Sequence, residues 1–390
     1  MHTSQAVEPR TEFLVFGSPL IEEAEIAEVV DSLRSGWIGS GPKVQRFERA
    51  LEEYIGVDHV RCVSSCTAAL MLGLVALGVG EGDEVIVPTL TFAASANAII
   101  HAGATPVFVD SEPGTGVLDL AAVEAAVTER TKAIMPVHFA GRPVDMDRLE
   151  ALRAKYSLAV IEDAAHAIGT EWRGKRIGSH GNLTAFSFYA TKNVTTAEGG
   201  ALATADRDVA ERIERLSLHG LSAGAWRRYS DAGFKHYEVI DPGFKFNLTD
   251  LHAAIGIHQL RKLDGWIRER ARLWDRYDEL LADLPLTLPP LPQLGTRHAR
   301  HLYQVLVDRG APMSRDRLLD FMTDQGIGVG VHYRPVHQHE WYRDRFGLGD
   351  DAFPVASDFG ARTVSLPLSP KLTDADQDRV ALALERALRA

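Results

Sequence analysis

The sequence has few cysteines, no long apolar run and no excess of positive charge. Its two cysteines, Cys62 and Cys66, are too few for a disulfide framework and are typical of a reducing compartment. No stretch approaches the roughly 18 apolar residues that suggest a membrane-spanning helix, and the polar residues 1–10 lack the apolar core of a secretion signal. The formal net charge of −11 argues against nucleic-acid binding. We therefore expect a cytoplasmic protein that binds neither nucleic acid nor a membrane.

Short apolar runs alternate with helical patterns through the first half of the chain. The chain has 390 residues, 45% of them hydrophobic, which is typical of a globular protein with a large core. Near-continuous apolar strands separated by helices predict an α/β fold with a mostly parallel sheet covered on both faces. Ligands of such sheets collect at the carboxyl ends of the strands. The expected strands are Val85–Val87, Pro106–Val109, Ala133–Val137, Ala159–Ile161, Ala185–Phe188 and Ala201–Ala203, and the helices between most of them are Ala68–Leu77, Ala93–Ala102, Leu120–Val127 and Met146–Tyr156.

The two ends of the chain follow other patterns. Ser18 followed by Pro19 predicts the start of an N-terminal helix. A long helical pattern runs from Leu248 to about Asp283, and a proline-rich linker and a smaller α+β unit follow it. We expect a large α/β domain over residues 18–250, and a long connecting helix with a small C-terminal α+β domain over residues 251–390.

Lys192 lies between two short β-like runs, among small polar residues and before the pair Gly199-Gly200. A lysine that forms a Schiff base requires a loop position fixed by strands, space for a flat ligand and surroundings that lower its pKa. A turn lysine in an ordinary hairpin explains the same residues. The pattern alone leaves both interpretations open.

Asp163 and His166 follow the apolar run that ends at Ile161. Asp163 suits a helix N-cap, or a carboxylate that keeps the pyridine nitrogen of pyridoxal 5'-phosphate (PLP) protonated. His166 suits a buried core histidine, or a hydrogen-bond partner of the phenolic oxygen of PLP.

Ser65, Cys66 and Thr67 form a polar turn between a strand and a helix, where backbone N–H groups and the Thr67 hydroxyl bind phosphate readily. Simple N-capping by Ser65 or Thr67 is compatible with that role. Phe92 follows a strand and suits either stacking on a flat ring or the core. Because His332, His337 and His339 lack a helical HExxH motif or cysteine partners, we expect no metal site.

Four motifs occur in a characteristic order: Ser64-Ser-Cys-Thr-Ala-Ala69, Glu162-Asp-Ala-Ala-His166, Ser187-Phe-Tyr-Ala-Thr-Lys-Asn193 and Glu198-Gly-Gly200. Together they resemble the DegT/StrS family of PLP-dependent nucleotide-sugar aminotransferases, which have the fold-type I aminotransferase fold. The resemblance runs from about Ser18 to the C-terminus.

The resemblance implies a role for each of these positions. Lys192 matches the Schiff-base lysine and Asp163 the partner of the pyridine nitrogen. His166 matches a residue near the phenolic oxygen, and Phe92 and Ala165 match residues on the two ring faces. The phosphate positions correspond to Ser65, Cys66, Thr67 and Ser187.

The segment Gly243–Asn247 resembles a loop that a partner subunit contributes to the phosphate. Many relatives carry asparagine where this chain has Lys245. The resemblance therefore implies a homodimer with shared active sites, in which Lys245 and Asn247 contact the cofactor.

The implied reaction moves the amino group of L-glutamate, by way of pyridoxamine 5'-phosphate (PMP), to a keto sugar. His166, Asn193 and the segments 245–250 and 328–333 most resemble the branch that acts at C4. This favours a dTDP- or UDP-linked 4-keto-6-deoxyhexose or a UDP-linked 4-keto pentose. The alternatives are a 3-keto nucleotide sugar, a cyclitol ketone, or a PLP-binding regulatory protein. A dehydratase branch replaces the lysine with histidine, so Lys192 argues against that reading.

Substrate contacts are expected from four segments. These are Trp37–Lys43, His138–Arg142, Trp226–Tyr237 and His332–His337, and the individual candidates are Trp37, His138, Phe244, His332 and Tyr333.

Overall fold

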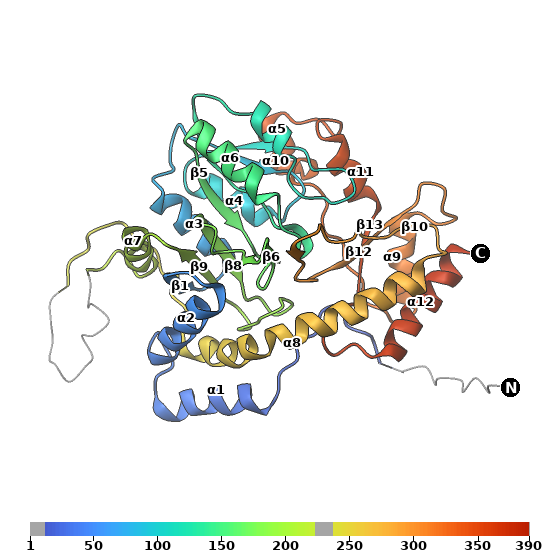
Figure 1. Cartoon of the computed structure of the whole chain (residues 1–390), viewed down its shortest axis with the longest axis horizontal. Helices are drawn as coiled ribbons and strands as arrows, with labels where there is room; N and C mark the ends of the chain where they lie inside the picture. Colours follow the sequence, from blue (N-terminus) through green and yellow to red (C-terminus); the bar gives the residue numbers. More distant parts are fainter. Residues whose placement is uncertain (1–11, 223–236, 390) are drawn as a thin grey trace.

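The computed structural model describes residues 12–222 and 237–389 of the chain (Figure 1). At its centre is a seven-stranded sheet in the order β1-β9-β8-β5-β4-β2-β3. All neighbours from β8 to β3 pair in parallel, whereas β9 runs antiparallel to β1 and β8. This confirms the predicted mostly parallel α/β fold. The strands are β1 (His59–Val63), β2 (Glu84–Pro88), β3 (Thr105–Val109), β4 (Thr131–Ile134), β5 (Ala159–Asp163), β8 (Leu183–Ser187) and β9 (Gly200–Thr204).

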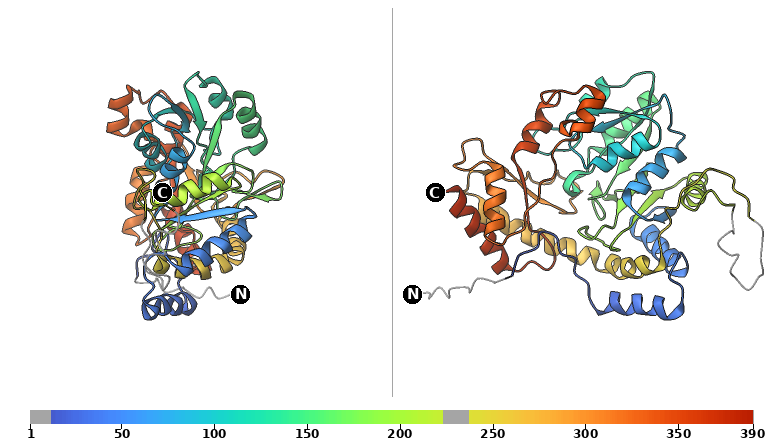
Figure 2. Two further views of the ribbon diagram at one scale, coloured as in Figure 1. Left: turned by 90° about the vertical axis from the view of Figure 1, so that its left-hand side faces the viewer. Right: turned by 180° about the vertical axis from the view of Figure 1, so that it is seen from behind.

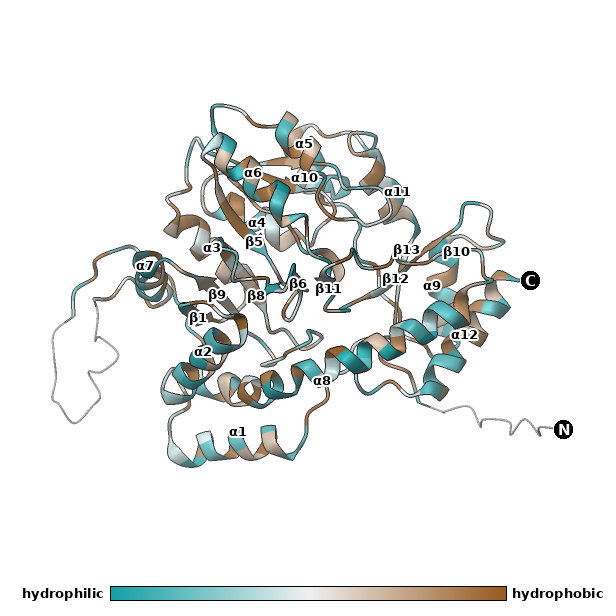
Figure 3. Ribbon diagram, viewed as in Figure 1, coloured by the Kyte–Doolittle hydropathy of each residue, from teal (hydrophilic) through white to brown (hydrophobic). Residues whose placement is uncertain are grey.

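Helices cover both faces of this sheet because its strands carry apolar side chains on both sides, visible as mostly brown ribbons in Figure 3. α3, α4 and α7 pack on one face, and α2, α5, α6 and α8 pack on the other. The four helices expected between residues 68 and 156 are confirmed as α3 to α6. The bounds are α1 (Glu23–Ser35), α2 (Pro42–Ile55), α3 (Cys66–Ala76), α4 (Ala93–His101), α5 (Leu120–Ala125), α6 (Met146–Tyr156), α7 (Arg207–Ser217) and α8 (Asp250–Leu281).

The N-terminal helix α1 begins later than the sequence predicts. Ser18 is not its N-cap, since the helix starts after Glu22. The backbone N–H of Glu22 donates to the Glu25 carboxylate at 3.2 Å, and Lys262 of α8 donates to the same carboxylate at 2.8 Å. Figures 1 and 2 show α1 lying along α8. Packing against α8 therefore sets the start of this helix, and the Ser18-Pro19 signal does not.

The long helix α8 is confirmed, and it leads into a second, smaller unit. This unit is built on a three-stranded antiparallel sheet in the order β10-β12-β13, with α9, α12 and the last turns of α8 packed around it. A turn of 3-10 helix, residues 336–338, and α10 pack against α4 of the large sheet. The bounds are β10 (Leu286–Thr287), β12 (Tyr303–Val307), α9 (Arg315–Asp324), α10 (Glu340–Phe346), α11 (Pro354–Arg362), β13 (Thr363–Leu366) and α12 (Asp374–Leu388).

A third, small sheet joins the two units. In it β11 (Thr296–Arg297) pairs with β6 (Glu171–Trp172), which in turn pairs with β7 (Lys175–Arg176). Residues 298–302 follow β11 directly and lie against the 3-10 turn at residues 139–141 beyond β4. Nowhere in residues 12–222 and 237–389 does a helix have the length and apolarity that crossing a membrane requires.

Candidate active site

The predicted lysine lies at the carboxyl edge of the large sheet. Lys192 follows β8, and its backbone N–H donates to the carbonyl of Tyr189 at 2.9 Å. Burial lowers the pKa of its ammonium from 10.5 to about 8, although Cys66 and Asp163 partly oppose this shift. About a tenth of Lys192 is therefore a neutral amine at pH 7, compared with well under a thousandth of an ordinary lysine, and the neutral amine is the nucleophilic form.

Asp163 ends β5 at the same edge, and 6% of its surface is exposed. Its carboxylate accepts hydrogen bonds from the Ser95 hydroxyl at 2.7 Å and from the backbone N–H of Ala165 at 3.1 Å. Burial raises the pKa of Asp163 above its ordinary 3.8, although these hydrogen bonds and the charge of Lys192 partly oppose the shift. Within the described residues no lysine or arginine forms a salt bridge with Asp163. A buried carboxylate without a paired cation is suited to a cationic ligand group.

The turn at Ser65, Cys66 and Thr67 connects β1 to α3. The Ser65 hydroxyl caps α3 by accepting from the N–H of Ala68 at 3.1 Å, and Thr67 is exposed in the first turn. Gly200 of β9 lies so close that a Cβ there would be 2.5 Å from the backbone nitrogen of Cys66. The turn is therefore held against the sheet, with the N-terminus of α3 available for an anion.

Aromatic and imidazole rings line the next part of this edge. Phe92 precedes α4 with 62% of its surface exposed, and its ring centroid is 5.8 Å from that of Tyr333. The Tyr333 oxygen is 3.1 Å from Nε2 of His166. His332 stacks on Phe16, with ring centroids 5.5 Å apart. This places the predicted Phe92, His166 and Tyr333 together.

Both ring nitrogens of His166 have partners. The N–H of Ala140 donates to Nδ1 at 3.2 Å, so Nδ1 carries no hydrogen. Burial, with the charges of Lys192 and His332, lowers the pKa of His166 well below 6.5, and the ring is neutral. Its single hydrogen is therefore on Nε2 and is donated to Tyr333. The hydroxyl hydrogen of Tyr333 remains free to donate to a ligand.

His138 is a correction among the predicted substrate residues. Its side chain is fully buried, with Nε2 2.9 Å from the Glu162 carboxylate and Nδ1 accepting from the N–H of Val144 at 3.3 Å. Because no part of the ring reaches a ligand surface, His138 supports β5 and does not contact a substrate.

Four more of the predicted cofactor and substrate residues differ in their burial and in their neighbours. Ser187 ends β8 and is buried, and Ala165 is half-buried. Phe244 stacks on Phe246 with ring centroids 5.1 Å apart. Trp37 is 49% exposed in the loop between α1 and α2. Of the expected segment Trp226–Tyr237, residues 226–236 lie outside the described residues.

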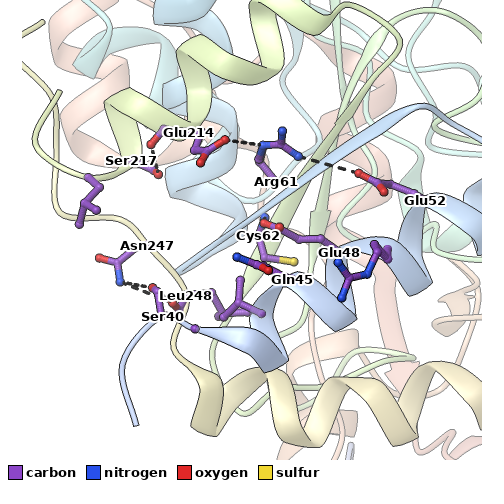
Figure 4. Close-up of a pocket in the computed structure, with 14 residues that line it drawn as sticks. Ser40, Gln45, Glu48, Glu52, Arg61, Cys62, Glu214, Ser217, Asn247 and Leu248 are labelled. Carbon is purple, nitrogen blue, oxygen red and sulfur yellow. Dashed lines mark hydrogen bonds and ion pairs between the residues drawn. The ribbon is translucent and has the colours of Figure 1, made fainter. Parts of the chain in front are cut away.

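Lys245 and Asn247 lie beside the end of β1. The carbonyl of Phe246 accepts from the N–H of Ser64 at 2.7 Å, and the exposed Lys245 donates to the side chain of Asn247. Asn247 in turn donates to the Ser40 hydroxyl at 2.6 Å. Both Asn247 and Ser40 line a hollow of about 370 Å³ between α2, β1 and α7 (Figure 4). Its lining includes neither Lys192 nor Asp163.

Three further residues belong to the site but were not among the predicted cofactor and substrate residues: Ser95, Asn193 and His301. Ser95 lies in an ordinary helical pattern that gives no sign of a site residue, and its role follows from its hydrogen bond to Asp163. Asn193 adjoins Lys192, but its partner His301 lies 108 residues away. No group of His, Cys, Asp and Glu side chains suited to a metal ion occurs in the part of the chain that the structure describes.

The arrangement fits PLP. A partly neutral lysine, a buried carboxylate without a paired cation and a helix N-terminus face the carboxyl edge of one sheet. These groups suit respectively an aldehyde, a protonated ring nitrogen and a phosphate. The exposed face of Phe92 suits a flat ring.

Comparison with known proteins agrees with this chemistry. The DegT/DnrJ/EryC1/StrS aminotransferase family matches residues 19–385. The spore coat polysaccharide biosynthesis protein SpsC of Bacillus subtilis (strain 168) is 47% identical over 376 residues, which cover 96% of this chain and 97% of SpsC.

Solved structures show the same architecture. Spr1654 of Streptococcus pneumoniae is known in apo, PLP and PMP forms. Its PLP form is 35% identical, with a TM-score of 0.88 and coverage of 96% of this chain and 100% of that one. Helicobacter pylori PseC, an aminotransferase involved in the biosynthesis of pseudoaminic acid, is 30% identical, with a TM-score of 0.89 and coverage of 97% and 100%. The resemblance found in the sequence is thereby confirmed, and the chain belongs to the DegT/DnrJ/EryC1/StrS family as a PLP-dependent sugar aminotransferase with the fold-type I fold.

Proposed function

We propose that this enzyme moves the amino group of L-glutamate to C4 of a nucleotide-linked 4-keto sugar. The sugar is a 4-keto-6-deoxyhexose on dTDP or UDP, or a 4-keto pentose on UDP. The observation that carries the proposal is Lys192, an amine whose pKa burial lowers to about 8, facing the buried carboxylate of Asp163. The preference for C4 rests on the resemblance of His166, Asn193 and the segments 245–250 and 328–333 to the C4 branch.

In this proposal Lys192 would hold the aldehyde carbon of PLP, and Asp163 would hold the proton on the ring nitrogen. When bound, PLP supplies a ring that accepts electrons from the carbon that loses its proton. Ser95 and the N–H of Ala165 fix the two oxygens of Asp163, so that the carboxylate keeps one orientation. The turn Ser65–Thr67 and Ser187 bind the phosphate, and Phe92 and Ala165 lie on the two faces of the ring.

Lys192 also moves the proton. Once an amino donor has displaced it, its Nζ takes the proton from the α-carbon of L-glutamate as a general base. It would deliver that proton to the C4′ carbon of the cofactor. In the second half of the reaction the same Nζ would take a proton from C4′ and deliver it to C4 of the sugar, the carbon that gains the amino group. A pKa near 8 suits both steps, because the amine both accepts and releases a proton near neutral pH.

The substrate side of the site is formed by His332 and Tyr333. The free hydroxyl hydrogen of Tyr333, fixed by the His166 tautomer, is a donor for an oxygen of the sugar or the cofactor. A sugar product agrees with the names of two similar proteins, the spore coat polysaccharide biosynthesis protein SpsC and PseC, an aminotransferase involved in the biosynthesis of pseudoaminic acid.

The enzyme is proposed to act in the cytoplasm as a homodimer with shared active sites. Phe92 and Tyr189, 62% and 47% exposed, leave apolar surface open beside the site. The exposed Lys245, which donates to the half-buried Asn247 in this subunit, would exchange that bond for one to the phosphate of a partner subunit. A second subunit placed there would cover the apolar rings and complete the phosphate site.

The test is a half-reaction. The protein is converted to the PMP form with L-glutamate, freed of excess donor, and mixed separately with dTDP-4-keto-6-deoxyglucose or a UDP-4-keto sugar. Return of the visible absorption band with one sugar identifies the nucleotide and supports transfer at C4. No return with either sugar, after a normal response to glutamate, would favour a 3-keto sugar or a cyclitol ketone. Failure to respond to glutamate at all would favour a regulatory role.

A further inference from the structure

The segment 298–302 connects the smaller unit to the active site. The N–H of Ala299 donates to the carbonyl of Gly141 at 3.2 Å, and that of His301 donates to the carbonyl of Ala140 at 3.1 Å. Ala140 also donates its own N–H to His166. The backbone of this segment is therefore fixed to the same turn that fixes His166.

Arg270 of α8 holds the segment from the other side. Its Nη1 donates to the carbonyls of Arg300 and His301, both at 3.3 Å, and to that of Leu368 at 3.0 Å. Arg270 is 4% exposed, and no carboxylate pairs with its guanidinium in the described part of the chain. A buried arginine bonded to backbone carbonyls fixes the path of the chain at this point.

The ring of His301 contacts two site residues at once. Its Nδ1 is 3.0 Å from the side-chain oxygen of Asn193, and its ring centroid is 4.4 Å from that of His166. The side-chain N–H of Asn193 donates to the carbonyl of Ala299 at 2.8 Å, which fixes the orientation of the amide. Since an amide oxygen only accepts, Nδ1 of His301 carries the hydrogen.

We propose that His301 is a positioning residue that holds the Lys192 loop through Asn193 and supports the His166 ring, against which its own ring packs at a tilt of 37°. The proposal rests on the function proposed above for Lys192. His301 does not contact Lys192 in this arrangement. It contacts Asn193, the residue that follows Lys192 in the sequence. Through it the smaller unit determines where the catalytic amine lies.

His301 acts as a neutral donor in this arrangement. Burial lowers its pKa well below 6.5, and His166, Lys192, Arg270 and His332 add to that shift. The ring therefore keeps the tautomer that Asn193 requires over the whole working pH range. A lost Nδ1 donor would leave the buried Asn193 oxygen unpaired. The loop would then loosen and admit water to Lys192, whose pKa is lowered chiefly by burial.

The functions of the ring are separable by substitution. His301→Asn keeps an N–H near the position of Nδ1 but removes the ring that packs against His166. His301→Phe keeps the ring and removes the donor, and His301→Gln moves the donor away from Asn193. Asn193→Ala removes the acceptor. A double-mutant cycle of His301→Phe with Asn193→Ala measures whether the two residues act as a pair.

The experiment measures the proton affinity of Lys192 in the cofactor-free protein. Lys192 is labelled with limiting acetic anhydride between pH 6 and 11, and its peptide is quantified by mass spectrometry. In the wild type the midpoint is expected near 8. In His301→Phe we expect it to rise by about half a pH unit, a roughly threefold gain in proton affinity. His301→Asn is expected to keep the wild-type midpoint, and the double variant to match Asn193→Ala.

An unchanged midpoint in folded His301→Phe, or additive effects in the cycle, would overturn the positioning role. If His301→Phe does not fold, His301→Gln provides the same comparison. A wild-type midpoint near 10.5 would instead contradict the function proposed for Lys192. The failure of the positioning role and the failure of the proposed function are thus distinguishable.

Discussion

Capture of PLP by the cofactor-free enzyme should depend on pH in a way that the burial of Lys192 determines. The ammonium has a pKa of about 8 in place of its ordinary 10.5. At pH 7.5 about a quarter of the molecules then carry the neutral amine, compared with about one in a thousand for an ordinary lysine. Only the neutral amine attacks the aldehyde, so capture near neutral pH should be faster by roughly two orders of magnitude.

The assay follows the absorption of lysine-bound PLP after mixing it with cofactor-free protein between pH 6 and 10.5. The capture rate should rise with pH, pass its midpoint near 8 and level off above about 9. Lys192→Ala is the control and should show no such band and no transamination. A rate that keeps rising about tenfold per pH unit up to pH 10 would show that Lys192 has an ordinary lysine pKa, and would contradict the lowered pKa.

Three further changes test other parts of the structure. Asp163→Asn should still bind PLP but lose at least about 100-fold in kcat for the glutamate half-reaction, since the ring nitrogen would lose its proton; stopped-flow absorbance measures this, and near-normal turnover would contradict it. Gly200→Ala should lower the melting temperature and weaken PLP binding, because its Cβ would lie 2.5 Å from backbone atoms of the phosphate turn, whereas Gly39→Ala, with no atom within 4 Å, should do neither. Burial opposes the ionisation of Glu28, yet hydrogen bonds with Arg46, His258 and Lys43 lower its pKa from 4.5 to about 2. Its stabilising effect is therefore complete above about pH 4.5 and is lost as the pH falls toward 2, so urea unfolding at pH 6 and pH 3 should differ less in Glu28→Gln than in the wild type.

Local patterns were enough to predict most of the fold. Apolar runs and helical periodicity located the sheet strands, α3 to α6 and the long helix α8, because these signals lie within each element. The Ser18-Pro19 signal was wrong, since contacts between Glu25 and Lys262, more than 200 residues apart, set the start of α1. Local sequence contains no information about such a partner.

In the site, too, local sequence predicted some residues, whereas contacts between distant residues determined others. Lys192, Asp163, Phe92 and the turn at residues 65–67 each follow a strand, so the sequence predicted that they share one edge of the sheet. His138 was wrongly placed among the substrate residues. Its buried partner, the Glu162 carboxylate, lies 24 residues away in the sequence, so the residues next to His138 do not indicate that its ring is buried. The sequence also could not show that His301 contacts Asn193 and His166, because the two units meet there only in the folded chain.

The central claim, that Lys192 is the lysine that binds PLP, is tested most directly by locating the bound cofactor. The PLP-loaded enzyme is reduced with sodium borohydride and digested, and the peptide that carries the pyridoxyl group is sequenced by mass spectrometry. If Lys192 binds PLP, a single label is expected on Lys192, and no label is expected when the enzyme is first treated with L-glutamate to convert it to the PMP form. A label on another lysine, or a label on Lys192 that glutamate does not remove, would contradict it.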